Sequence, residues 1–135
     1  MCVDGILAQT TRTIKALIGL ATEGAPAEEI EVAFRALRDQ WTAAEREAAH
    51  APAGSAARFD AEAAALLGDA YQPVLNGLCA GRSPRSSDVD LAHRVAAWLN
   101  LAYRSLLEGD HEGVERCMAA AAAFVAIQSR HRPAE

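Results

Sequence analysis

Two short motifs in the sequence pair a carboxylate with a histidine at the spacing of one helical turn. Residues 47–50 read Glu-Ala-Ala-His, and Asp90 precedes His93 by the same three positions. Helical bundles that bind two iron or manganese ions use inward-facing Glu-x-x-His motifs of this kind, together with a Glu from each of two further helices. A metal site here would require both motifs to face the axis of a bundle.

Helical phase argues against such a site. At 100° per residue, Glu47 lies roughly 100° and His50 roughly 160° from the centre of the apolar stripe of their segment. Asp90 and His93 lie roughly 140° and 160° from the stripe of theirs. Both motifs are therefore expected on solvent-facing sides of helices, and the sequence predicts no metal and no other cofactor.

No residue has the surroundings of a catalytic nucleophile. Cys117 lies at the edge of an apolar helix face without an identifiable base, so a small core residue is the favoured interpretation. Ser83, Ser86 and Ser87 belong to one polar segment, and none of them sits in a Gly-x-Ser-x-Gly turn. The sequence therefore favours a non-enzymatic protein.

The polar segment 81–87, Gly-Arg-Ser-Pro-Arg-Ser-Ser, lies directly before a predicted helix. Arg82, Arg85, Ser86 and Ser87 are candidates to bind a phosphate or carboxylate, because the amide groups at a helix N-terminus favour an anion. The alternative is a polar loop that ends in a cap, with Ser87 as the capping residue three positions before Asp90.

Five segments have the apolar periodicity of amphipathic helices and are separated by turns that contain Gly or Pro. The first runs from about 3 to 23, and the second begins at Pro26 and ends before the turn 51–55. The third begins near 56 and ends before the loop 81–87, the fourth extends from this loop to Gly109, and the fifth covers about 111–130. Short connections predict an all-α, antiparallel bundle of about five helices. Residues 1–130 are expected to form one domain, with 131–135 as a frayed tail.

Pro73 lies inside the third predicted helix, where it removes a backbone donor and crowds the preceding turn. We expect a kink or a break near Pro73, which can open a ligand pocket between helices. The alternative is a kink that only lets the helix follow the curve of the bundle. The residues predicted to line the pocket are Tyr71, Gln72, Asn76, Trp98 and Cys117, with Trp41 and Tyr103 as further candidates.

Composition excludes several classes of function. A net charge of -5 with no basic face argues against nucleic acid and anionic membranes as partners. No apolar run is long enough to cross a membrane, and the start lacks the pattern of a signal peptide. Three scattered cysteines suit a reducing compartment, so a cytoplasmic location is expected. Twelve arginines against one lysine, with alanine near a quarter of the chain, indicate a GC-rich bacterial genome.

The favoured function is binding of protein, either a second copy in a homodimer or a helix of a partner, as adaptors and chaperones do. The alanines at 119–123 offer a smooth helix surface, and Ile127 lies outside the apolar stripe of its helix. The alternative is a small-molecule site, or a catalytic one, in the pocket near Pro73.

Overall fold

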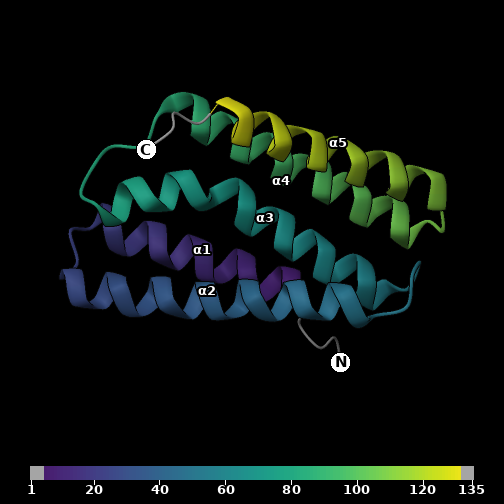
Figure 1. Cartoon of the computed structure of the whole chain (residues 1–135), viewed down its shortest axis with the longest axis horizontal. Coiled ribbons are helices and arrows are strands. Elements are labelled where there is room, and N and C mark those ends of the chain that lie inside the picture. Colours follow the sequence, from purple (N-terminus) through teal and green to yellow (C-terminus); the bar gives the residue numbers. More distant parts are fainter. Residues whose placement is uncertain (1–4, 132–135) are drawn as a thin grey trace.

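Five α-helices form an elongated bundle in the computed structural model, which describes residues 5–131. The helices are α1 (Ile6–Thr22), α2 (Ala27–His50), α3 (Ala56–Cys79), α4 (Ser86–Leu107) and α5 (His111–His131). Short turns join them, so that successive helices run in opposite directions (Figure 1). The predicted all-α bundle is confirmed. Of the tail predicted for 131–135, His131 is the last residue of α5, and residues 132–135 lie outside the described part of the chain.

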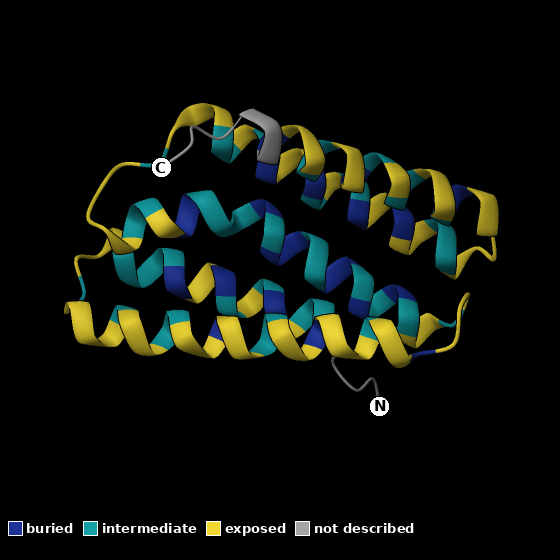
Figure 2. Ribbon diagram, viewed as in Figure 1, coloured by how far each residue is buried: buried dark blue, intermediate teal, exposed yellow. Residues whose placement is uncertain are grey.

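Helix α3 occupies the centre of the bundle and packs against the four other helices. Helices α1 and α2 cover one side of it, and the hairpin of α4 and α5 covers the other (Figure 1). Because α3 is enclosed on both sides, small and apolar residues occupy most of its circumference, as expected for a buried helix. Its buried residues are Phe59, Ala61, Ala63, Ala64, Leu67, Gly68, Ala70, Val74 and Leu75 (Figure 2).

A carboxylate from α3 caps the first turn of α1. The Asp60 Oδ2 atom accepts a hydrogen bond from the Ile6 amide at 2.6 Å, and Oδ1 accepts one from the Leu7 amide at 3.2 Å. The residue before α1 is Gly5, and a Cβ atom there would lie 2.6 Å from Asp60 Oδ1. The absence of a side chain at position 5 therefore lets the carboxylate reach the helix end, where its charge also complements the helix dipole.

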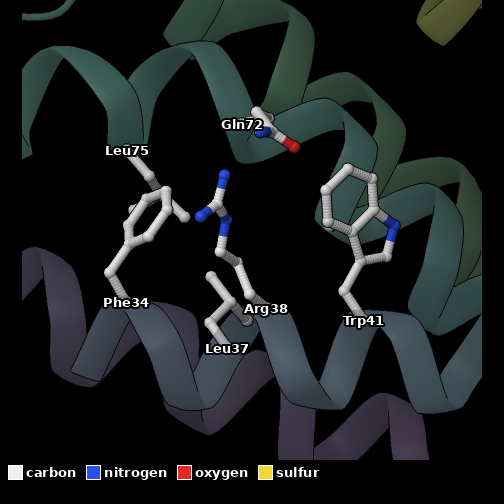
Figure 3. A pocket seen from close by; sticks show the side chains of 7 residues that line it. Phe34, Leu37, Arg38, Trp41, Gln72 and Leu75 are labelled. Atoms are coloured by element: carbon white, nitrogen blue, oxygen red, sulfur yellow. The ribbon is translucent and has the colours of Figure 1, made fainter. Parts of the chain in front are cut away.

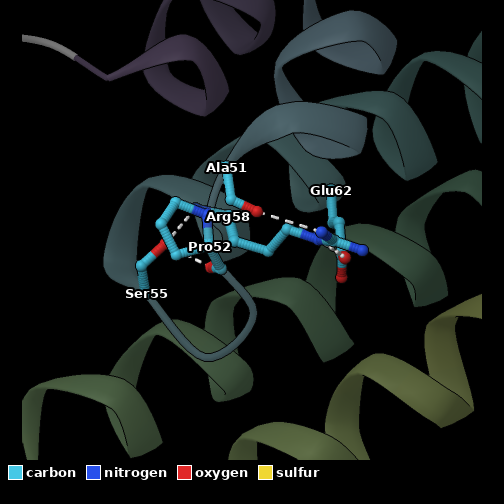
Figure 4. A network of polar contacts seen from close by, with 5 residues as sticks. All are labelled: Ala51, Pro52, Ser55, Arg58 and Glu62. Atoms are coloured by element: carbon cyan, nitrogen blue, oxygen red, sulfur yellow. Dashed lines mark hydrogen bonds and ion pairs between the residues drawn. The ribbon is translucent and has the colours of Figure 1, made fainter.

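The turn between α2 and α3 is held by a local polar network (Figure 4). The Ser55 hydroxyl accepts a hydrogen bond from the Arg58 amide at 3.1 Å and donates one to the Pro52 carbonyl at 2.7 Å. The Arg58 guanidinium donates to the Ala51 carbonyl at 3.0 Å and to Glu62 Oε1 at 2.5 Å. Ser55 is thus a conventional N-cap for α3.

Helix α3 bends near Pro73 but does not break, since its helical residues are continuous from Ala56 to Cys79 (Figure 1). Close to the bend, the buried side chain of Gln128 on α5 donates a hydrogen bond from Nε2 to the Ala70 carbonyl at 3.2 Å. The bend therefore lies where α5 docks on α3. This contact favours the structural interpretation of Pro73.

Candidate functional site

The second half of α5 presents an uncharged face to solvent. No charged residue occurs between Arg116 and Arg130 in the sequence. The residues of this face are all exposed (Figure 2), and at 100° per residue they share one side of the helix. We call them the α5 face: Ala119, Ala122, Ala123, Ala126 and Ile127.

The α5 face is separate from the side of α5 that builds the core. Ala121 is fully buried, and Val114, Met118, Phe124 and Val125 pack against the core as partly buried residues. The α5 face is therefore apolar surface that remains after the core is filled. Its Ile127 side chain is 43% exposed.

Helix α4 places two further large aliphatic side chains, Leu101 and Leu107, on the surface of the same hairpin. Leu101 is 46% exposed. The contact between Gly113 and Ser105 shows which residues of α4 and α5 lie side by side, because a Cβ atom at Gly113 would lie 2.7 Å from Ser105 Oγ. Since the two helices are antiparallel and rise equally per residue, Leu101 lies near the level of Cys117.

A shallow groove lies between α2 and α3 beside the bend (Figure 3). The Arg38 guanidinium lies over the Phe34 ring, 5.5 Å from its centroid, in the geometry of a cation–π contact. The Trp41 indole packs beside Gly68, where a Cβ atom would lie 3.1 Å from Trp41 Cδ1. The Trp41 Nε1 atom is buried without a hydrogen-bond acceptor. The groove is lined by Phe34, Leu37, Arg38, Trp41, Gly68, Gln72 and Leu75.

The enclosed volume of this groove is about 10 Å³, which is about the space that one water molecule needs. Pockets for drug-sized ligands usually enclose about 300–1,000 Å³. The groove therefore has no room for a small-molecule ligand in this conformation.

The structure does not gather the predicted pocket residues in one place. Gln72 lines the groove, whereas Asn76 is exposed. Tyr71 faces α4 with its ring centroid 6.5 Å from that of His93, and burial raises the pKa of its phenol. Trp98 on α4 and Cys117 on α5 pack against the core. Of the two further candidates, Trp41 lines the groove and Tyr103 contacts Phe59, with ring centroids 6.4 Å apart.

The predicted anion-binding residues lie together at the start of α4, and all four are exposed: Arg82, Arg85, Ser86 and Ser87. The helix begins at Ser86, and Arg85 occupies the N-cap position without a side-chain hydrogen bond. The prediction of Ser87 as the cap is therefore wrong, because the helix starts two residues earlier and includes Ser87 in its first turn. Anion binding by this loop stays a prediction.

The two carboxylate–histidine motifs face outward, as their helical phase predicts. Glu47, His50, Asp90 and His93 are all exposed. Within residues 5–131, no group of three or more His, Cys, Asp or Glu side chains is arranged to hold a metal ion. In the same range, no helix combines the length and the apolar character needed to cross a membrane.

Comparison with known proteins adds no further constraint. The chain matches no known protein family, no curated protein and no solved structure. Function is therefore argued from the surfaces described above.

Proposed function

We propose that this protein is a non-enzymatic binding protein that packs the α5 face against a helix of another protein chain. The observation that carries the proposal is the exposed, uncharged row along the second half of α5, which includes the 43% exposed Ile127. A solvated helix face normally carries charged or polar residues. An exposed apolar face of this kind is typical of a surface that binds protein.

Alanine suits close packing between helices. Interaxial distances of 8–10 Å depend on the side chains at the contact, and small ones allow the shortest approach. Alanine also loses no rotamer freedom when it is buried. The partner helix is therefore expected to present small or aliphatic residues, either from a second copy of the chain or from a different protein, as in adaptors and chaperones.

The test is native mass spectrometry of the gently purified protein and of two matched variants. Ala122→Glu places a charge in the α5 face, and Ala36→Glu makes the same substitution at an exposed position of α2. We expect the wild type and Ala36→Glu to carry a bound protein chain that Ala122→Glu lacks, with equal melting temperatures for all three. A wild type that carries no protein chain at any concentration would refute the proposal.

A further inference from the structure

We infer that the α4–α5 hairpin opens from α3 as one unit, into a rare form in which α1, α2 and α3 remain folded. This inference goes beyond the proposed function and does not depend on it, because the α5 face is already exposed when the hairpin is closed. Three features of the molecule support it: the contacts between helices, the loop that joins α3 to α4, and the size of the side chains where the hairpin docks.

The hairpin is attached to the rest of the bundle through α3 (Figure 1). Among the described residues, no Cα atom of α4 or α5 lies within 8 Å of one in α1 or α2. Helices α1 and α2 pack against each other and against α3, and α4 packs more extensively against α5 than against α3. The Asp110 carboxylate also caps α5 from within the hairpin, by accepting a hydrogen bond from the Gly113 amide at 3.0 Å. The bundle therefore consists of two groups of helices, each with its own contacts, that meet at α3.

The loop 80–85 is placed to act as a joint between the two groups. Its residues are exposed except for Pro84, which is half-buried. The amides of Gly81 and Arg82 donate to the carbonyls of Leu78 and Gly77, at 3.0 and 2.8 Å, and so bind the loop to the end of α3. A change of conformation after Arg82 would move the hairpin away from α3 without breaking a described hydrogen bond of α1 or α2.

Alanine is common where the hairpin docks. The buried apolar residues of the hairpin are Ala92, Val95, Leu99, Ala102 and Ala121. The buried apolar residues of α1 and α2 are larger on average: Ile14, Leu17, Leu37 and Ala44. Burial of an alanine side chain removes less apolar area from water than burial of leucine or isoleucine, so it stabilises less. Separation of the hairpin is therefore expected to cost less free energy than unfolding of the whole chain.

Opening would uncover an apolar stripe on α3. In the closed form the Phe59 ring lies 6.4 Å from that of Tyr103, between centroids, and the Ala70 carbonyl accepts the hydrogen bond from Gln128. Residues three or four positions apart share one side of a helix, which defines the rest of this stripe. The stripe comprises Phe59, Ala63, Leu66, Ala70 and Val74. The hairpin thus covers a second apolar surface, which is separate from the α5 face.

Native-state hydrogen exchange, followed by NMR for each amide, tests the opening. The conditions are those in which the exchange rate reports the opening equilibrium. We expect the slowest amides of α4 and α5 to share one degree of protection, lower than that of the slowest amides in α1–α3 by on the order of tenfold or more. Equal protection in all five helices would overturn the inference, because the bundle would then open only as a whole.

Two substitutions distinguish opening of the hairpin from unfolding of the whole chain. Asp60→Ala removes the cap of α1, which is present in the closed and the open form alike. It should leave exchange in α4 and α5 unchanged and speed the slowest amides of α1–α3 about five- to thirtyfold. Gln128→Ala removes a hydrogen bond that exists only in the closed form. It should speed the slowest amides of all five helices about five- to thirtyfold.

Gly5→Ala displaces the same carboxylate as Asp60→Ala removes, and serves as its matched variant. It should repeat the pattern of Asp60→Ala, with unchanged exchange in α4 and α5. If either substitution speeds the slowest amides of α4 and α5 as much as those of α1–α3, the hairpin does not open as a separate unit.

Discussion

Replacing Gly5 by alanine should destabilise the protein through a contact with a different helix. The new Cβ atom would lie 2.6 Å from Asp60 Oδ1, so the carboxylate would have to withdraw from the start of α1. It would then lose hydrogen bonds of 2.6 and 3.2 Å to the amides of Ile6 and Leu7. Loss of a cap costs about 0.5–2 kcal/mol, and we expect about 1–2 kcal/mol because a charged acceptor from another helix is involved.

The assay is urea unfolding followed by circular dichroism for Gly5→Ala, Asp60→Ala and the double variant. Each single substitution should lower the free energy of unfolding by about 1–2 kcal/mol. Because both act on the same cap, the double variant should lose little more than Asp60→Ala alone, with a coupling of about 1 kcal/mol. If the losses in free energy of unfolding are additive, or if Gly5→Ala is as stable as the wild type, the capping of α1 by Asp60 does not depend on the absence of a side chain at position 5.

Three further predictions concern the interior. Gln128→Ala should lower the free energy of unfolding, measured in urea, by about 1–2 kcal/mol, because the Ala70 carbonyl loses its hydrogen bond from α5. An unchanged value would show that this hydrogen bond does not help to hold α5 against α3 near the bend. Gly68→Ala should shift the fluorescence emission of Trp41, because the new Cβ atom would contact the indole. It should raise the free energy of unfolding by less than the roughly 1 kcal/mol by which alanine stabilises a helix relative to glycine. An unchanged emission together with the full stabilisation would show that the indole does not contact position 68. Burial raises the pKa of Tyr71, so the unfolded chain ionises first and the free energy of unfolding should fall as pH rises through about 10. Tyr71→Phe should reduce this fall, and an identical pH profile would contradict the assignment.

The fold follows from local patterns that are strong in this sequence. Apolar periodicity identifies all five helices, and the glycines at 24, 81 and 109 mark three of their ends with positive φ. Pro73 predicts the bend of α3. The predicted start of α4 is two residues too late, because Ser86 and Ser87 are both acceptable caps by type and the structure uses neither.

Local patterns of this kind do not predict contacts between segments that are far apart in the sequence. Nothing near Gly5 indicates that its cap comes from Asp60 on another helix. The groove beside the bend contains Gln72 and Trp41, but the other predicted pocket residues face other neighbours, because α3 is enclosed on both sides. Periodicity gives the apolar stripe of each helix and not the helix that covers it. The α5 face was predictable in outline, since an alanine run with an outlying isoleucine is visible in the sequence.

The most direct test of protein binding by the α5 face is sedimentation velocity of the wild type, Ala122→Glu and Ala36→Glu over a concentration range from nanomolar to about 100 μM. We predict that the wild type and Ala36→Glu sediment with a further protein chain bound, either a second copy or a different protein, while Ala122→Glu stays monomeric with an unchanged melting temperature. Three proteins that sediment alike at every concentration, with no bound partner chain in the wild type, would contradict the proposal.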